Sequence, residues 1–252
     1  MLTLEQICKT YGAVTAVDHV DLTLMPGESM ILAGESGSGK TTVARIVAGM
    51  EIPDSGRVLL DGRQLAASNR KRIFDNSVNI QYIFQDPYNA LEPGFTVRKT
   101  LEETARICRR HGREVLPMEE ALRFVDPRLV DYLDRPIREM SGGQRQKVCI
   151  ARALMPQPRI LIADESTSML DKQSGLDVFN LLNRIKKEKN ISVLVILHDV
   201  DFSYTEWDRI GVMYRGKLVE QARFSEFPQT AIHPYSRRLL EAYDFFNKRT
   251  QE

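Results

Sequence analysis

The chain has 252 residues, of which 42% are hydrophobic and 27% charged, and its formal net charge is +1. This composition indicates a globular chain with a sizeable core in one or two domains, and the near-neutral charge gives no support for binding to nucleic acid or to an anionic membrane surface. Three cysteines stand far apart without a C-x-x-C pair, which argues against a zinc motif or a disulfide framework and fits a reducing compartment. Without a signal pattern or an apolar run near the roughly 20 residues of a membrane span, we expect a soluble chain.

The N-terminal segment predicts antiparallel strands. Apolar residues alternate over residues 2–7 and again over 20–24, and turn signals stand at Tyr11-Gly12 and Pro26-Gly27. A short strand is also expected from Val58 to Leu60, between two Gly-containing turns. These strands precede and flank the segment described next.

A glycine-rich loop follows an apolar, strand-like run at 30–33 and precedes a helix-like run at 43–49. The loop fits G-x-x-x-x-G-K-[ST], in which backbone N–H groups at a helix N-terminus hold the phosphates of a nucleotide. Lys40 would place its charge on the β- and γ-phosphates, and Thr41 its hydroxyl on Mg²⁺. A plain Gly/Ser hairpin would leave Lys40 and the helix unexplained. The predicted phosphate-binding residues are Gly34, Glu35, Ser36, Gly37, Ser38, Gly39, Lys40, Thr41 and Thr42.

Helical periodicity dominates from about Thr96 to Met155, including a stretch from Val115 to Val125, and predicts a helical subdomain inserted into a nucleotide-binding core. Near its end, Met140 to Gln144 reads M-S-G-G-Q and precedes a helix-like stretch. Ser141 suits the N-cap position, and Gly142-Gly143 would let backbone N–H groups meet an anion. Read alone, the segment is more readily explained as an ordinary helix start.

Two short apolar segments, 160–163 and 191–197, are typical of buried parallel strands, with a helix expected between them at 175–189. This alternation predicts a doubly wound α/β core. The first strand ends in Asp164-Glu165, where Asp164 would hold Mg²⁺ and Glu165 would polarise an attacking water. Without the upstream loop, a plain strand end would explain the pair as well. A strand pair around Arg215-Gly216 and an amphipathic tail follow.

Together these segments resemble the ATP-binding cassette family, the nucleotide-binding domains of ABC transporters, over nearly the whole chain. The matching positions are the signature Met140 to Gln144 (with Met for the usual Leu), Gln85 of the Q-loop, Ser168 to Asp171 of the D-loop, the switch His198, and the aromatic Tyr11. Each of these alone is an ordinary residue, but their order and spacing make joint coincidence implausible.

The resemblance implies ATP and Mg²⁺ as ligands and assigns a role to each position. Tyr11 would stack on adenine, His198 would contact the γ-phosphate, and Asp171 would act across a dimer interface. The implied catalytic residues are Glu165, His198, Gln85 and Lys40; the implied metal ligands are Thr41, Gln85 and Asp164; and Ser141, Gly142, Gly143 and Gln144 would bind ATP held by a second subunit.

The implied fold is an α/β P-loop NTPase of the ABC cassette type, with a RecA-like core, an antiparallel β subdomain and an inserted helical subdomain. The expected segments are the β subdomain with the P-loop part of the core (1–85), the helical subdomain with the signature (86–156), the remainder of the core (157–222) and a C-terminal helical tail (223–252).

The family also implies a mechanism, in which two cassettes pair head to tail around two ATP molecules, so that binding closes the dimer and hydrolysis reopens it. Ser166, Met169 and Leu197 depart from the usual pattern, which has proline, alanine and a small hydroxyl residue at these positions. None of the departures removes a charged catalytic position, so an active ATPase is expected.

Two segments indicate a particular subgroup of the family. Residues 85–93 (Q-D-P-Y-N-A-L-E-P) resemble the extended Q-loop of the peptide/nickel importer group, and residues 233–240 (H-P-Y-S-R-R-L-L) resemble its C-terminal helix, although an amphipathic tail with an early Pro would also explain them. The resemblance implies an importer subunit for peptides, nickel or metal–chelator complexes at the cytoplasmic face of the membrane. Its partners would be permeases, a second ATPase chain or a second copy, and indirectly an external solute-binding protein, with no nucleic acid.

Other classes share these motifs. DNA-maintenance ATPases insert long coiled coils, whereas here about a hundred residues without sustained heptads separate the loop from the signature. Translation-associated members carry two cassettes in one chain. An ATPase subunit of a soluble multienzyme complex, of the phosphonate-breakdown type, has a similar cassette and stays open, and a purely regulatory module is disfavoured because Glu165, Gln85 and His198 are all present.

Overall fold

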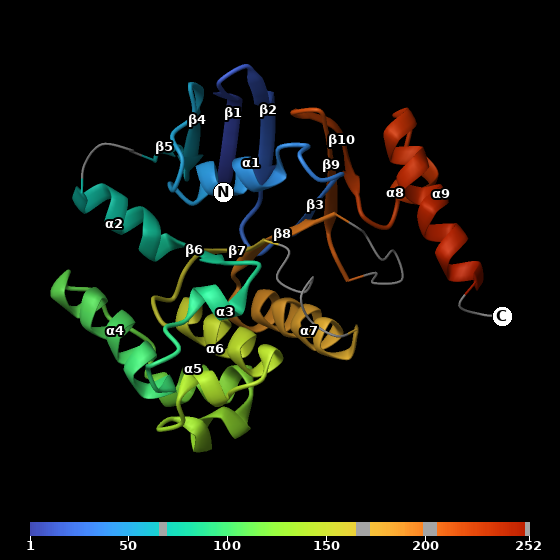
Figure 1. Ribbon diagram of the computed structural model, residues 1–252. Coiled ribbons are helices and arrows are strands. Elements are labelled where there is room, and N and C mark those ends of the chain that lie inside the picture. Colours follow the sequence, from blue (N-terminus) through green and yellow to red (C-terminus); the bar gives the residue numbers. More distant parts are fainter. Residues whose placement is uncertain (66–69, 165–171, 199–205, 250–252) are drawn as a thin grey trace. The chain divides into compact units, whose positions relative to one another are not determined.

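The computed structural model describes residues 1–65, 70–164, 172–198 and 206–249 (Figure 1). The chain forms two compact units. Unit 1 comprises Met1–Ile73 and Ser192–Glu252, and unit 2 comprises Phe74–Ile191, so unit 2 is an insertion in the sequence of unit 1. The four segments expected from the sequence are finer than these units and stay a prediction.

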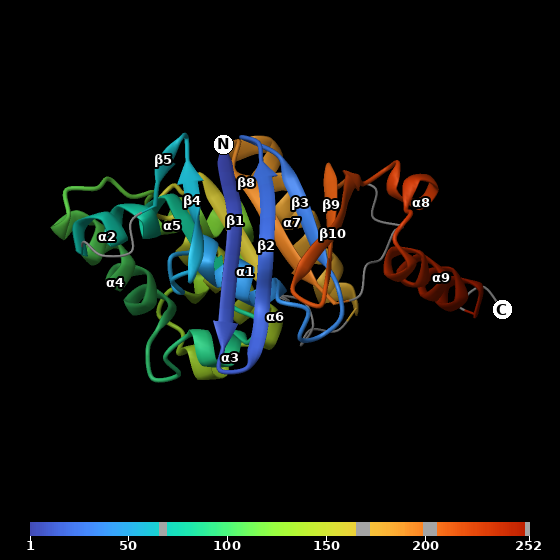
Figure 2. The ribbon, with the colours of Figure 1, turned by 90° about the horizontal axis from the view of Figure 1, so that it is seen from above.

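Unit 1 contains an antiparallel sheet in which the described strands follow the order β2-β1-β4-β5, with β4, β1 and β2 side by side in Figure 2. Its strands are β1 (Leu2–Tyr11), β2 (Val14–Leu24), β4 (Ser55–Leu60) and β5 (Arg63–Gln64). The alternating apolar side chains meet across the strands, since Leu2 pairs with Leu24 and Leu4 with Leu22, and all four are buried. The expected strands are confirmed here because one face of the sheet is buried and sets the register.

The β1–β2 pairing is irregular after Leu4. The next buried residue of β1 is Ile7, three positions on instead of two, and it pairs with Val20 across a register shift. Gln6 and His19 have φ values of 51° and 50°, in the left-handed region. These features mark β-bulges, which increase the local twist and redirect side chains.

Unit 1 also contains four strands in the order β10-β9-β3-β8. They are β3 (Ser29–Ala33), β8 (Ser192–Leu197), β9 (Arg209–Tyr214) and β10 (Lys217–Arg223). β3 is parallel to β8 and to β9, whereas β9 and β10 are antiparallel. Every residue of β3 and β8 is buried, as expected for parallel strands covered on both faces. Helix α1 (Lys40–Val47) contacts β2 and β8.

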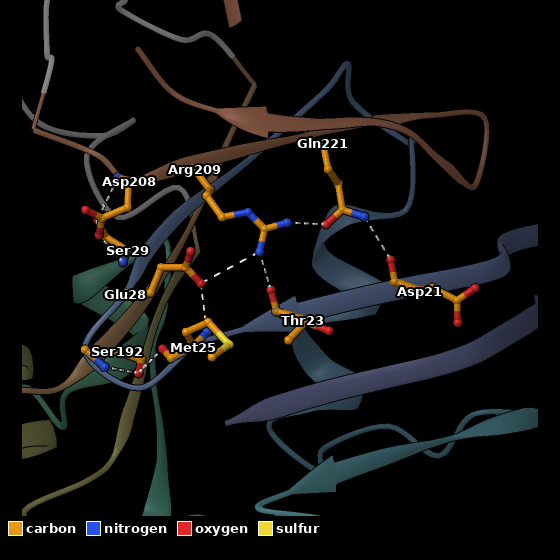
Figure 3. A network of polar contacts seen from close by, with 10 residues as sticks. Asp21, Thr23, Met25, Glu28, Ser29, Ser192, Asp208, Arg209 and Gln221 are labelled. Carbon is orange, nitrogen blue, oxygen red and sulfur yellow. Dashed lines mark hydrogen bonds and ion pairs between the residues drawn. The ribbon is translucent and has the colours of Figure 1, made fainter. Parts of the chain in front are cut away.

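A polar network joins the two sheets of unit 1 (Figure 3). Arg209 of β9 donates from Nη1 to the carbonyl of Thr23 on β2 at 2.8 Å and from Nη2 to Gln221 Oε1 on β10 at 3.0 Å. Asp208 Oδ2 accepts hydrogen bonds from the backbone N–H and the hydroxyl of Ser29, both at 2.7 Å. The network therefore fixes the start of β3, the strand that leads into the glycine-rich loop.

Unit 2 contains the parallel strands β6 (Ile80–Ile83) and β7 (Ile160–Asp164), which pair with each other. Helix α2 (Arg70–Asn79) leads into β6. The further helices are α3 (Pro87–Ala90), α4 (Val97–Arg110), α5 (Met118–Val125), α6 (Gly142–Leu154) and α7 (Lys172–Lys189), with 3₁₀ turns at Pro127–Tyr132 and Ile137–Glu139.

The helical character expected between 96 and 155 is confirmed. In α4 the buried residues include Leu101, Ala105 and Cys108, which share one face. The expectation was wrong for Val115, which lies in the connection between α4 and α5, because α4 ends at Arg110 and Gly112 turns the chain with a φ of 69°.

The chain ends with helices α8 (Phe227–Thr230) and α9 (Pro234–Arg249), next to β9 and β10 in both ribbon views (Figures 1 and 2). Trp207 is 4% exposed and therefore contributes to the packing of unit 1. Within the described ranges, no helix combines the length and the apolar character needed to cross a bilayer.

Candidate functional site

The glycine-rich loop connects β3 to α1 in unit 1, the strand–loop–helix arrangement that the motif requires. Gly34 has a φ of 152°, and an added Cβ would lie 2.3 Å from the Met213 carbonyl oxygen on β9. Gly39 has a φ of 103°, and its Cβ would lie 2.2 Å from the Ala16 carbonyl oxygen on β2. Both positions therefore require glycine because the backbones of neighbouring strands approach them closely.

Several hydrogen-bond donors face the interior of the loop, and some of them have no partner among the described residues. Lys40 is 4% exposed, and its ammonium group donates to the carbonyls of Gly34 at 2.6 Å and Glu35 at 2.9 Å. Ser38 Oγ is buried and has no hydrogen-bond partner among the described residues. The backbone N–H groups of Gly37 and Gly39 also make no hydrogen bond within the described part of the chain. A cation, a buried hydroxyl and free N–H groups at a helix N-terminus form a binding site for an anion.

The loop is anchored by a turn that is distant in the sequence. The N–H of Gly216, between β9 and β10, donates to the Ser38 carbonyl at 3.0 Å, and the Gly216 carbonyl accepts from the N–H of Asp18 on β2 at 2.8 Å. From the sequence, Arg215-Gly216 was only a turn between strands. Its contact with the loop joins residues about 180 positions apart, and no local pattern marks such a pairing.

Two further predicted residues lie in unit 1. His198 is exposed and follows directly after β8, whose last residue Leu197 pairs with Ala33, the last residue before the loop. The register therefore places His198 beside the start of the loop. Tyr11 ends β1, is 45% exposed and has the Lys9 ammonium 5.4 Å from its ring centroid. Among the described residues, no backbone hydrogen bond joins Tyr11 to the loop.

Unit 2 brings Gln85 and Asp164 to the same end of two paired strands. Ile83 of β6 pairs with Ala163 of β7, so Asp164 comes one residue after the paired positions and Gln85 two. Asp164 is 7% exposed, and its Oδ2 accepts a hydrogen bond from the hydroxyl of Tyr82. Tyr82 was missed from the sequence, because within the apolar run 80–84 it looks like an ordinary strand residue.

The segment Met140 to Gln144 begins helix α6, as predicted. Ser141 is the N-cap: its Oγ accepts from the N–H of Gln144 at 3.3 Å, while Gln144 Oε1 accepts from the N–H of Ser141 at 3.0 Å. This reciprocal pair is a capping box. Arg145, 6% exposed, donates to the carbonyls of Met140 and Arg138, both at 3.0 Å, so side chains hold this loop in place.

A cavity of about 150 Å³ lies beside this helix start, lined in part by Ser141, Gly143 and Lys147. At its wall, Asp126 Oδ2 accepts from Arg128 Nη2 at 2.7 Å and from Lys147 Nζ at 2.9 Å. The hydrogen bonds from Arg128, and then those from Lys147, hold the pKa of the Asp126 carboxyl well below its usual range. Asp126 is therefore ionised and fixes Lys147 on the first turns of α6.

Glu165 and Asp171 lie outside the described residues, so their predicted roles stay predictions, as do those of the departures Ser166 and Met169. The same holds for the binding roles of the described residues, whose positions are given above without any ligand.

Comparison with known proteins decides the family. The model of the ABC transporter family matches residues 17–168. The chain is 37% identical over 235 residues to "Oligopeptide transport ATP-binding protein OppF" of Bacillus subtilis, covering 92% of this chain and 77% of the relative. It is 37% identical over 231 residues to "Oligopeptide transport ATP-binding protein AmiF" of Streptococcus pneumoniae, covering 90% of this chain and 75% of the relative.

The chain belongs to the ABC transporter family. Among solved structures it resembles a dimeric ATP-binding cassette in a post-hydrolysis state with ADP and phosphate bound, with a TM-score of 0.75 and 27% identity over 89% of this chain and 99% of that one. The fold expected from the sequence, an ABC-type α/β P-loop cassette with antiparallel and parallel sheets, is confirmed.

Membership of the ABC family gives the chain ATP as its ligand and ATP hydrolysis as its activity. The chain is an ATP-binding subunit that acts with permeases and dimerises, as ABC importer subunits do.

Proposed function

We propose that this chain is the ATP-hydrolysing subunit of an importer for peptides, within a group that also takes up nickel or metal–chelator complexes. This proposal rests on the 37% identity of the chain, over at least nine tenths of its length, to each of two subunits named for oligopeptide transport. The segments 85–93 and 233–240 support the same subgroup. Transport is favoured over the soluble multienzyme and DNA-maintenance alternatives because these relatives are named for transport.

The phosphates of ATP fit the loop before α1. Their oxygens match the buried Ser38 hydroxyl and the free N–H groups of Gly37 and Gly39 in chemistry. Lys40 exchanges its carbonyl partners at Gly34 and Glu35 for the β- and γ-phosphates. Tyr11 offers an exposed ring for adenine.

For Mg²⁺, the family resemblance assigns Thr41, Gln85 and Asp164, whose hydroxyl, amide carbonyl and carboxylate are the kinds of oxygen ligand that this ion prefers. The bound ion neutralises charge that develops on the phosphates. The hydroxyl of Tyr82 orients the Asp164 carboxylate.

The remaining assigned residues complete the chemistry. Glu165 accepts a proton from the attacking water, and His198 donates to the γ-phosphate. The N-terminus of α6, with Ser141 to Gln144, faces ATP held by the other subunit of the dimer, and Asp171 acts across the same interface. ATP therefore forms part of the interface, and its hydrolysis reopens the dimer.

The proposed assembly places the chain at the cytoplasmic face of the membrane. Its partners are permeases and a second ATPase chain, either a different chain or a second copy, while an external solute-binding protein acts through the permeases. Nucleic acid has no part in it.

The solution mass of the Glu165→Gln chain with and without ATP tests the mechanism. Loss of the general base lowers turnover by about 10²- to 10⁴-fold and keeps bound ATP intact. A shift to dimer only with ATP supports the paired assembly, and a monomer that binds ATP indicates that a different chain completes the pair. A chain that binds no ATP contradicts the site. Glu119→Gln, which removes the same charge from the first turn of α5, is the control and keeps wild-type turnover.

Copurification tests the transport assignment. We expect the chain to copurify with membrane permeases from detergent extracts, and cells with Lys40→Ala to lose uptake of a labelled peptide. Recovery with soluble enzymes only, together with normal peptide uptake in a deletion strain, would contradict the importer and favour the multienzyme alternative.

A further inference from the structure

Three side chains with metal-binding atoms meet at the irregular part of the β1–β2 pair. They are Cys8 on β1 and Asp18 and His19 on β2, and one ligand atom of each lies within 4.8 Å of the others. Within the described part of the chain, no other group of three or more His, Cys, Asp or Glu residues has this spacing.

The β-bulge explains why these side chains converge. Ile7 pairs with Val20 and Lys9 with Val17, so Cys8 alone on β1 faces both Asp18 and His19 on β2. In a regular strand, neighbouring side chains point to opposite faces. The left-handed φ of 50° at His19 breaks this alternation and brings both β2 side chains to Cys8.

The contacts around the cluster hold its atoms in place. The backbone N–H of His19 donates to Cys8 Sγ at 3.3 Å, and His19 Nδ1 lies 2.6 Å from Asp18 Oδ1. Lys217 Nζ lies 3.3 Å from the other oxygen, Asp18 Oδ2. Metal-bound carboxylates and thiolates usually have such outer hydrogen bonds, which orient the ligand atoms. The two negative charges of the Cys8 thiolate and the Asp18 carboxylate exceed the single positive charge of Lys217, so the cluster still attracts a cation.

We propose that Cys8, Asp18 and His19 bind one Zn²⁺ ion, with water as the fourth ligand. A thiolate, an imidazole and a carboxylate are the ligand types of tetrahedral zinc sites, and three protein ligands leave one position open. As the ion binds, the thiol proton of Cys8 passes to solvent, and His19 binds as a neutral imidazole through its unprotonated ring nitrogen. Mg²⁺ does not compete, because it prefers oxygen ligands. The ion joins β1 to β2 across the bulge, in the hairpin that carries Tyr11.

The first experiment uses the full-length chain without an affinity tag, freed of metal by a chelator and titrated with Co²⁺. We expect one ion per chain and a thiolate-to-cobalt charge-transfer band, which Cys8→Ser abolishes and Cys108→Ala keeps. Cys8 is the accessible thiol, because Cys108 and Cys149 are buried and burial raises the pKa of Cys149 to about 11. A band that persists in Cys8→Ser would contradict the site.

The second experiment measures the Zn²⁺ affinity of histidine and aspartate variants by competition with a chelator of known affinity. His19 exposes 67% of its side chain, so His19→Ala leaves the core intact, and we expect it and Asp18→Asn to weaken binding at least about tenfold. The matched controls His111→Ala, in unit 2, and Asp21→Asn, on the same strand, keep wild-type affinity. Zn²⁺ should raise the unfolding temperature of the wild type and not that of His19→Ala.

Three further results would overturn the proposal. They are a wild-type chain that binds neither Zn²⁺ nor Co²⁺ at one ion per chain, a loss of binding that follows His111→Ala instead of His19→Ala, and Zn²⁺ binding that millimolar Mg²⁺ displaces. Because exposed side chains are changed, unchanged circular dichroism of His19→Ala separates lost binding from lost folding.

Discussion

The loops before α1 and α6 both contain paired or repeated glycines and both precede a helix, yet they are held in different ways. Backbone contacts fix the first: Gly34 and Gly39 lie against carbonyl oxygens of β9 and β2, and the N–H of Gly216 binds the Ser38 carbonyl. Side chains fix the second, through the capping box and Arg145. The same residue type therefore answers two different requirements.

The difference shows where each glycine is needed. Gly34 and Gly39 have left-handed φ values that the rest of unit 1 requires. Gly142 and Gly143 belong to helix α6 and have no left-handed φ, so the backbone of this chain does not require glycine there. Gly142 and Gly143 are half-buried, and the absence of side chains leaves room beside the start of α6. This fits the proposal that ATP held by a second subunit binds there.

Gly34→Ala should have the largest effect on folding. The new Cβ meets the Met213 carbonyl at 2.3 Å, and alanine is strained at a φ of 152°. We therefore expect the free energy of unfolding to fall by about 3 kcal/mol or more, and ATP binding to be lost as well. Chemical denaturation measures the first and nucleotide titration the second. Gly37→Ala is the control. A Cβ at this position would lie in open space at a φ of 78°, so the free energy of unfolding should fall by only about 1 kcal/mol. Equal losses would contradict the steric argument.

Arg145→Met should come next. It keeps the aliphatic volume but leaves the Met140 and Arg138 carbonyls without their buried donor, at a cost of about 2–3 kcal/mol in the free energy of unfolding. Urea unfolding measures it. Arg138→Met at a more exposed position serves as the control and should change stability by less than about 0.5 kcal/mol. An Arg145→Met chain as stable as wild type would show that the backbone alone holds the loop before α6.

Asp126→Asn should weaken the same region in a pH-dependent way. Because folding lowers the pKa of Asp126, its ionised form stabilises the fold above the unfolded pKa of about 4, and this stabilisation is lost as the pH falls through the folded value. We therefore expect the variant to lose about 2 kcal/mol at pH 7, and the gap to wild type to narrow below pH 4. Denaturation at both pH values measures it, and a constant gap would contradict the assigned ion pairs.

Gly143→Ala should have the smallest effect on stability and a large effect on function. Alanine suits a helical position, so the free energy of unfolding should stay within about 0.5 kcal/mol of wild type or rise slightly. The added methyl group obstructs the open helix start, so ATP-dependent dimerisation and turnover should fall while ATP binding to the monomer persists. Unchanged turnover would contradict the proposal that ATP held by a second subunit binds at the N-terminus of α6.

Local patterns predicted a large part of the fold and of the site. The alternation at Leu2 and Leu4 set the first strand, and the G-x-x-x-x-G-K-[ST] loop and its flanks fixed β3 and α1. Helix boundaries moved by a few residues, since α1 begins at Lys40 instead of Val43. The Ser141–Gln144 capping box had a local signal, S-x-x-Q, of which only the Ser141 half was used.

Residues that act through long-range contacts could not be predicted. Tyr82 reaches Asp164 because β6 and β7 pair in one register, and Gly216 reaches Ser38 across most of the chain. Cys8 was set aside because no second cysteine stands three positions away, as C-x-x-C requires, yet Asp18 and His19 approach it from the opposite strand at a bulge. Spacing along the chain says nothing about partners across a sheet.

Gly216 makes two backbone hydrogen bonds, and one of them is to the phosphate-binding loop. The state of its amide therefore depends on the state of that loop. Its N–H is held by Ser38 and its carbonyl by Asp18. Hydrogen exchange at this single amide would therefore slow whenever the loop is closed and quicken whenever it lifts, and the adjacent amide of Asp18 would follow with it. A pair of resonances far from the nucleotide along the chain would thus report how often the loop opens.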